Sequence, residues 1–180
     1  MPSSELEKPK LCAFLDNAVI MIGRTTGWLT VVLVAAIIAQ VVLRYGFKSG
    51  MSSLEELQWH LYAVIFMIAL SYSLVQDAHI RLDLLHQRFS PRLKEWVEVI
   101  GIIFLLIPMV VVFFLHGLPF AAKSFSIMER SPAPTGLPYR FIIKSFLPIG
   151  IGLLGIAALS RLIRGVHILL TLKRRTRHGR

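Results

Sequence analysis

The sequence predicts an all-α integral membrane protein with four transmembrane helices, amphipathic interfacial helices and both termini in the cytoplasm. Of its 180 residues, 55% are hydrophobic and 17% are charged, a balance that would leave a soluble domain of this size with more apolar surface than it could bury. Four apolar segments alternate with polar ones, each close to the length that crosses a bilayer. Most Lys and Arg residues fall on the side that would carry both chain ends, which favours cytoplasmic termini.

The positive charge of the chain indicates contacts with membrane lipids, and nucleic acid is not expected as a partner. The formal net charge is +10, but the basic residues lie beside apolar spans, and no separate soluble domain is long enough to present a basic face. We interpret them as topology signals and phospholipid contacts. The single cysteine, Cys12, excludes an intramolecular disulfide.

Residues 1–24 are predicted to form a loose tail followed by an amphipathic helix in the membrane surface. Apolar residues recur at helical spacing between 11 and 24, around Asp16 and Arg24. The first span follows at about 25–43. It is longer than the apolar core of a secretory signal and no cleavage site follows it, so we expect an uncleaved signal anchor.

The second span, at about 57–75, has charged residues at both of its margins. At ~1.5 Å per residue its apolar run is roughly 28 Å long, close to the ~30 Å hydrocarbon core of a bilayer. The link at 46–53 is short and contains two glycines. Spans one and two are therefore predicted to be antiparallel neighbours.

Two interpretations are open for the acidic pair at the start of this span. Ser53 and Glu56 match the S-x-x-E pattern of a capping box, in which the glutamate reaches back to the backbone of the cap. Alternatively, Glu55 or Glu56 pairs with Arg44 or with a cation on another subunit. Near the dry boundary of the membrane such a pair fixes orientation more than it adds stability.

A second interfacial helix is predicted at about 76–90. Leu82, Leu85 and Phe89 fall on one face of this helix, and the charged residues, among them Arg81 and Asp83, occupy the other faces. This amphipathic pattern is typical of a helix that lies flat in the membrane surface.

The third span is predicted at about 96–115. Ser90 and Pro91 precede it as a cap and a first helical residue. Pro108, inside the span, predicts a kink because proline removes one backbone hydrogen bond of the helix.

The longest connection is an outer loop at 117–140 with four prolines. Its first part, up to about Met128, can continue the third helix into water, whereas the following proline-rich part is predicted to be a loop. The fourth span, at about 141–163, is expected to kink at Pro148. A basic cytoplasmic tail at 164–180 completes the chain, so that the four-helix membrane domain comprises residues 25–163.

The centre of the membrane is predicted to lack ionisable groups. Asp, Glu, Lys, Arg and His are absent from the central part of every span, at about 29–39, 61–70, 102–111 and 150–158. The nearest polar residues are Gln40, Ser71 and Ser73, for which interhelical hydrogen bonds are expected. Transport of a charged solute normally requires polar or ionisable groups at that depth. We therefore expect any transport chemistry to belong to a partner.

Two further patterns have ordinary structural interpretations. Gly150, Gly152 and Gly155 spell the G-x-G-x-x-G dinucleotide fingerprint, but no strand precedes them and no acidic residue follows at the required distance, so we expect close helix packing. His60 and His116 fall near the outer ends of their spans. A membrane cytochrome would use such residues as haem ligands, although interfacial histidines with ordinary hydrogen bonds are commoner.

Several segments together resemble the small membrane subunit, DctQ type, of tripartite ATP-independent periplasmic (TRAP) transporters. The resemblance covers approximately residues 15–170 and rests on Arg44, Tyr45 and Phe47, the acidic pair Glu55 and Glu56, HIRLDLL at 79–85, and GLPYRFIIKSFLPIG at 136–150. It implies a non-enzymatic scaffold subunit of the bacterial inner membrane, without cofactor. In such a system a soluble periplasmic protein captures an organic acid, and a large membrane subunit moves it with a sodium gradient.

With this resemblance, three groups of contact residues are expected. They are Arg44, Tyr45, Glu55, Glu56 and Trp59 for the large subunit, Arg81, Leu82, Asp83, Leu85 and Phe89 for a brace at the inner surface, and Arg130, Tyr139 and Arg140 for the periplasmic substrate-binding protein.

Two alternative functions are kept. The first is a self-sufficient oligomeric transporter with Glu98 as its proton-linked group, although Glu98 lies close to the membrane surface and is expected to pair with Arg92 or Lys94. The second is a haem-bearing membrane anchor.

Overall fold

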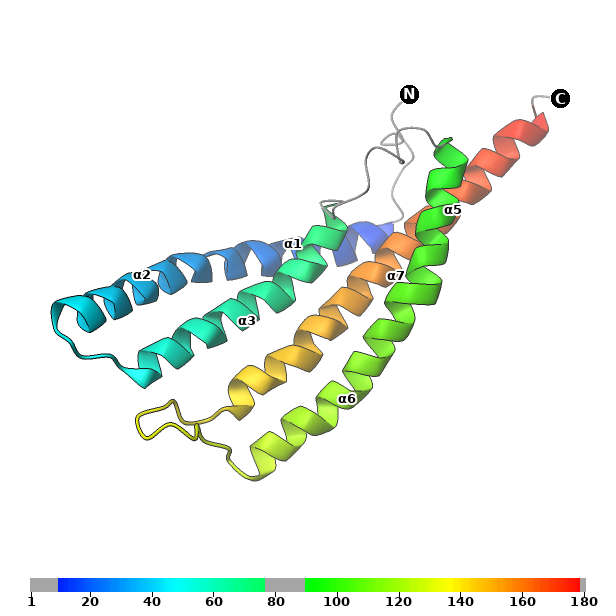
Figure 1. Ribbon diagram of the computed structural model, residues 1–180. Coiled ribbons are helices and arrows are strands. Elements are labelled where there is room, and N and C mark those ends of the chain that lie inside the picture. Colours follow the sequence, from blue (N-terminus) through cyan, green and yellow to red (C-terminus); the bar gives the residue numbers. More distant parts are fainter. Residues whose placement is uncertain (1–9, 77–89, 179–180) are drawn as a thin grey trace.

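The computed structural model describes residues 10–76 and 90–178, which form long helices joined by short connections (Figure 1). Four helical segments are long and apolar enough to cross a membrane, namely Lys10–Gly46, Ser52–Val75, Arg92–Ser126 and Phe141–Thr171. The all-α membrane fold with four spans is therefore confirmed. The interfacial helix predicted at 76–90, with Arg81, Leu82, Asp83, Leu85 and Phe89, lies outside the described residues except for its two ends.

The first helical segment is longer and more continuous than predicted. Helix α1 (Lys10–Gly27) passes through a single turn residue, Trp28, into α2 (Leu29–Val41). A π-helical turn at Val42–Gly46 ends the segment. Helix α1, for which a position in the membrane surface is expected, packs along α3 and α7, and Val19 in α1 is completely buried there. The apolar face of α1 therefore contacts other helices of the bundle.

Helix α3 (Ser52–Val75) lies antiparallel to α2 after a short link, as predicted (Figure 1). The third segment consists of α5 (Pro91–Gly101), a π-helical turn (Ile102–Leu106) and α6 (Ile107–Ser126).

The start of α5 and the irregularity near Pro108 both follow from the sequence. Ser90 caps α5, because its hydroxyl accepts a hydrogen bond of 3.3 Å from the Leu93 N–H. The π-helical turn lies directly before Pro108. Proline cannot donate to the preceding turn, and a wider turn accommodates the missing hydrogen bond. Helix α6 continues to Ser126, so the connection expected at 117–140 is reduced to residues 127–140.

Helix α7 (Phe141–His178) is the longest described helix and the centre of the bundle. It lies between α3 and α6 (Figure 1) and also contacts α1 and α5. The region predicted as a basic tail, 164–180, is helical up to His178. Leu154, Ala157 and Ala158 of α7 are almost completely buried and form the middle of the core.

The glycines of α7 permit this central position. A Cβ atom on Gly150 would lie 2.7 Å from Met67 Cβ in α3, and one on Gly155 would lie 3.1 Å from Val110 Cγ1 in α6. The contact at Gly150 is shorter than real Cβ contacts, so a side chain there would force Met67 to shift, whereas the contact at Gly155 is tight and would require a small movement of Val110. The helix-packing interpretation of the G-x-G-x-x-G pattern is confirmed.

Candidate functional site

The middle of the bundle offers hydrogen bonds between helices and no evident ligand site. Ser71 Oγ donates to the Gly150 carbonyl over 3.4 Å, and Gln58 Nε2 donates to the Ala36 carbonyl over 3.2 Å. The interhelical role expected for Ser71 is thus confirmed. Within residues 10–76 and 90–178, no group of three or more His, Cys, Asp or Glu side chains lies together as metal ligands would.

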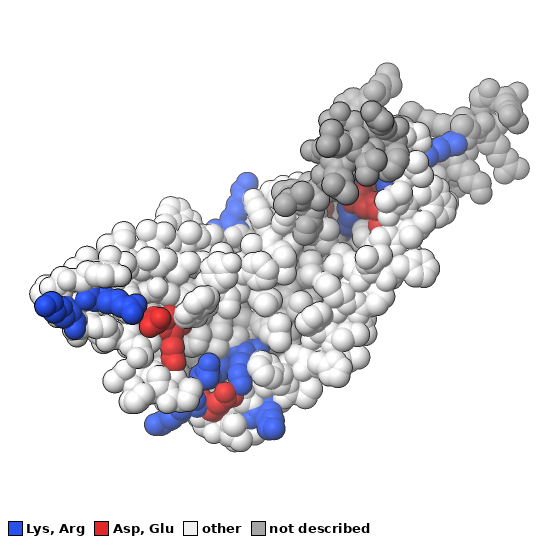
Figure 2. Space-filling model, in the orientation of Figure 1, with Lys and Arg blue, Asp and Glu red and all other residues white. Residues whose placement is uncertain are grey.

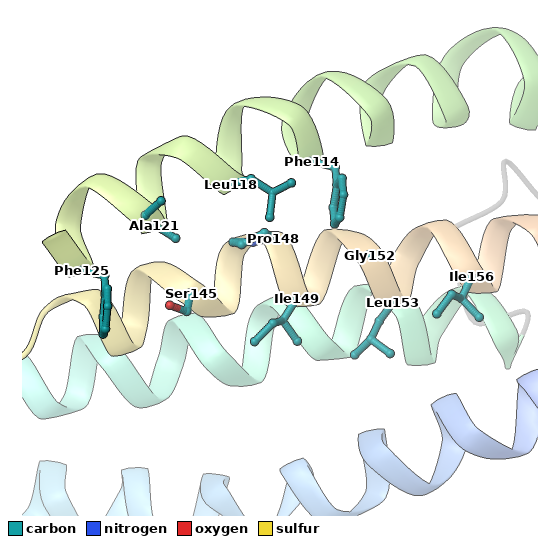
Figure 3. Close-up of a pocket in the computed structure, with 11 residues that line it drawn as sticks. Phe114, Leu118, Ala121, Phe125, Ser145, Pro148, Ile149, Gly152, Leu153 and Ile156 are labelled. Carbon is teal, nitrogen blue, oxygen red and sulfur yellow. The ribbon is translucent and has the colours of Figure 1, made fainter.

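A groove of about 650 Å³ lies between α6 and α7 (Figure 3). Its walls are apolar, from Phe114 and Leu118 on α6 to Ile149 and Leu153 on α7. Ser145 is the exception, and its hydroxyl donates to the Phe141 carbonyl of its own helix at 2.7 Å. The groove therefore presents hydrocarbon surface and no charged group that would bind an organic anion.

Charged side chains gather at the two ends of the bundle (Figure 2). We call the end with the α2–α3 link and the 127–140 loop the loop end. The opposite end, where α1 and α5 begin and α7 ends, is called the terminal end (Figure 1). On the face shown in Figure 2, the surface between the two ends is largely uncharged.

At the loop end, Glu56 holds the 127–140 loop. Its Oε2 accepts a hydrogen bond of 2.7 Å from the Leu137 N–H, and its Oε1 accepts one from the Ser131 hydroxyl. The capping-box interpretation is therefore wrong: Met51 is the cap residue of α3, and no side chain caps that helix. The carboxylate prefers two loop donors to the single backbone donor of its own helix.

The loop itself has a specific internal structure. Gly136 donates to the Ala133 carbonyl at 3.0 Å, and the Ala133 N–H donates to Ser131 Oγ at 3.1 Å. A Cβ atom on Gly136 would collide with the Ser131 side chain and lie 3.0 Å from Glu56 Oε1. Gly136 has no positive φ, so the lack of space, and not the backbone conformation, requires glycine here.

A second set of contacts joins the loop to α7. Glu129 forms an ion pair with Lys144, and the Glu129 carbonyl accepts a 2.9 Å hydrogen bond from the Arg140 N–H. The hydrogen bond from Lys144 holds the pKa of the Glu129 carboxyl below its ordinary value. The Lys144 ammonium also lies 4.5 Å from the centre of the Phe120 ring, a cation–π contact with α6.

The residues expected to contact partners lie mostly on the surface of the loop end. Arg44, Tyr45, Glu55 and Trp59 are exposed, and Glu56 is half-buried under the loop. Of the three expected for a periplasmic protein, Arg130 and Tyr139 are exposed and Arg140 is half-buried. Trp59 belongs to an exposed aromatic face of α3 that also includes Tyr62 and Phe66, whose rings stack with centroids 6.3 Å apart.

At the terminal end, Arg161 of α7 forms ion pairs with Glu95 and Glu98 of α5. Arg161 NH1 lies 3.3 Å from Glu95 Oε2, and NH2 contacts Glu98 Oε2. Arg161 is thus a partner of Glu98 that was not predicted from the sequence. Glu95 and Glu98 are three residues apart and share a helix face, so one guanidinium on a neighbouring helix reaches both carboxylates.

Helix α1 contributes a second polar contact to α7 at the same end. Ser160 Oγ donates to Asp16 Oδ1 over 2.6 Å, and Cys12 Sγ lies 3.6 Å from the Ser160 carbonyl. Asp16, Cys12 and Ser160 are all buried. These contacts and the adjacent Arg161 cluster fix how α1 and α5 pack against α7.

The comparisons with known proteins agree with the resemblance seen in the sequence. The family model for the DctQ component of tripartite ATP-independent periplasmic transporters matches residues 33–167. No individual curated protein matches the chain.

Proposed function

This chain belongs to the DctQ family, the small membrane component of TRAP transporters in the inner membrane, and from that membership we propose that it is a scaffold subunit for sodium-driven uptake of an organic acid. The large membrane subunit carries the substrate and ion sites. A soluble periplasmic protein delivers the substrate. The family is one of transporter components and not of enzymes.

The uncharged middle of the bundle is the observation that supports a scaffold role. Moving an organic anion and sodium across a membrane requires groups at mid-depth that replace the hydration of both. The helices of this chain place their charged clusters at the two ends (Figure 2). The groove between α6 and α7 is apolar. Binding and translocation therefore belong to the large subunit.

The orientation that fits this function places the terminal end in the cytoplasm and the loop end in the periplasm. Among residues 10–76 and 90–178, most Lys and Arg residues belong to elements of the terminal end, including the last turns of α7. Cytoplasmic segments carry the excess of positive charge in membrane proteins. The 127–140 loop then faces the compartment in which the substrate-binding protein diffuses.

Contact with the large subunit is proposed along α2 and α3 near the loop end. Trp59, Tyr62 and Phe66 present a continuous aromatic face, and aromatic side chains are the typical anchors of protein interfaces. Exposed Tyr45 lies nearby, at the end of the first helical segment. Of the acidic pair, Glu55 is exposed for such a contact, whereas the Glu56 carboxylate is engaged by the loop.

The experiment that tests this function is coexpression of the tagged chain with the membrane and periplasmic proteins encoded beside it, followed by gentle solubilisation. We expect the large subunit to copurify. Reconstituted vesicles should take up an organic acid only when all three proteins and a sodium gradient are present. Trp59→Ala together with Phe66→Ala should reduce copurification, whereas Leu170→Ala, an exposed apolar residue near the terminal end, should not.

Two results would overturn the proposal. Uptake by this chain alone would show a self-sufficient transporter, for which Glu98 would need direct testing. A Soret absorbance band in the purified chain would instead show haem bound through residues such as His60 and His116.

A further inference from the structure

The 127–140 loop is anchored to α3, which is distant in the sequence, and to α7, which directly follows the loop. Glu56 of α3 binds Ser131 and Leu137 of the loop, across 75 and 81 residues of chain. At the other side of the loop, Glu129 binds Lys144 of α7. These contacts close the loop end of the bundle, so that the loop has a defined shape before any partner arrives.

The backbone conformation at both edges of the loop also indicates that the loop has a defined shape. Met128 and Tyr139 adopt φ values of 45° and 63°, which cost energy for residues with a Cβ atom and persist when surrounding contacts enforce them. Tyr139 is held by an edge-on contact with Phe141, with ring centroids 5.9 Å apart. A loop with this many constraints is preorganised, and preorganisation raises the affinity of a binding surface because less order must be created on binding.

The charges that remain exposed at the loop end are mainly positive. The glutamates Glu56 and Glu129 are half-buried and bonded within the molecule. The exposed cations are Arg44, Lys48, Lys123 and Arg130, against one exposed anion, Glu55. A soluble protein that docks here meets a basic surface, so charge complementarity requires an acidic patch on that protein.

We propose that the 127–140 loop is a rigid docking platform whose shape is set by the Glu56 tether, and that its exposed Arg130, together with the other exposed cations of the loop end, receives an acidic patch of the periplasmic substrate-binding protein. This inference rests on the proposed function, since it names the surface through which that partner binds. Glu56 acts as a positioning residue, because its hydrogen bonds hold the loop in place. Arg130 and Tyr139 form the contact surface.

The test uses the complex of this chain with its large subunit in lipid nanodiscs and measures the affinity of the purified substrate-binding protein. Glu56→Ala removes both loop hydrogen bonds and should weaken binding about tenfold, the equivalent of one charge-assisted hydrogen bond. Glu56→Gln has the same length and retains an oxygen that can accept from Leu137, so it should bind nearly as well as the wild type. Ser53→Ala is the control on the same helix turn.

A second variant disturbs the structure of the same loop without changing any charge. Gly136→Ala introduces the steric collision with Ser131 and should also weaken binding about tenfold. Gly50→Ala is its matched control, because a Cβ atom there meets nothing within 4 Å and the φ of Gly50 is not positive. Arg130→Glu should weaken binding at low salt, and the difference should shrink at high salt because ions screen the exposed charge.

Copurification separates the outcomes. If the large subunit does not copurify with the wild-type chain, the proposed function itself fails. If the complex forms and Glu56→Ala and Gly136→Ala bind the periplasmic protein as tightly as the wild type, the platform is refuted. A Glu56→Gln variant as weak as Glu56→Ala would overturn the positioning role and show that the negative charge itself is required. Unchanged binding by Arg130→Glu would overturn the acidic complementarity.

Discussion

Replacing Arg161 by Met should destabilise the bundle strongly, because it removes the cation that Glu95 and Glu98 share. Removing one partner of a buried ion pair costs about 3–5 kcal/mol. The exposed fractions of the side chains are 7% for Arg161, 14% for Glu95 and 20% for Glu98, so water recovers little of this loss. The two carboxylates would also repel each other across one helical turn. Methionine has a similar length and keeps the packing of α7.

The assay is thermal unfolding of the full-length chain in mild detergent, followed by circular dichroism. For a chain of this size ~1 kcal/mol corresponds to about 2–4 °C, so the melting temperature should fall by about 6–20 °C. Lys123→Met, which removes an exposed cation of α6, is the control and should change stability by less than about 0.5 kcal/mol.

A triple replacement tests whether the loss of stability comes from the unpaired charges or from packing. Changing Arg161, Glu95 and Glu98 together to Met should restore most of the stability, because an apolar cluster can replace a buried ion cluster without loss. If the Arg161→Met variant has the same melting temperature as the wild type, the ion pairs do not hold α5 to α7. If the triple variant is no more stable than the single one, the loss comes from packing and not from charge.

The remaining predictions concern packing and pH. Gly150→Ala should destabilise the contact of α7 with α3 by about 1–3 kcal/mol through overpacking. Gly101→Ala is the control and should be neutral or slightly stabilising, because nothing lies within 4 Å of its Cβ. Thermal unfolding of the two variants measures the difference. Because the pKa of Glu129 is lowered in the folded state, its contribution to loop stability is present above the unfolded pKa of about 4.3 and is lost as the pH falls through the folded value. Amide exchange of the loop, corrected for intrinsic rates, should accelerate over that acidic range, and Glu129→Gln should reduce this pH dependence but leave the part that comes from Glu56. Ser160→Ala should leave buried Asp16 with one hydrogen bond fewer and lower the melting temperature by an amount equivalent to about 1–3 kcal/mol.

Local patterns in the sequence predicted the four membrane-spanning helices. Apolar runs of bilayer length identify membrane helices because lipid removes every alternative partner for the backbone. The cap at Ser90 and the irregular turn near Pro108 also follow from single residues. By contrast, the packing of α1 against α3 and α7 does not follow from its sequence, because its apolar face matches a bilayer interface and a helix bundle equally well.

The polar contacts between distant segments could not be predicted from local sequence patterns. Glu56 fitted a local capping rule, but its actual donors lie 75 and 81 residues further along the chain. Arg161 reaches Glu95 and Glu98 across more than sixty residues. The spacing of Glu95 and Glu98 indicated a shared face, but which helix supplies their cation depends on the packing order of the helices, which periodicity does not contain.

The central position of α7 has a consequence for how the protein is made. This helix is synthesised after α1, α3, α5 and α6, yet all four pack against it. The earlier helices are therefore made before their common neighbour. The ion pairs of Glu95 and Glu98 with Arg161 form only after α7 has been added to the bundle. Chains that stop before Phe141 would lack Arg161, the ion-pair partner of Glu95 and Glu98 at the terminal end of the bundle, a feature by which membrane proteases could distinguish unfinished subunits from complete ones.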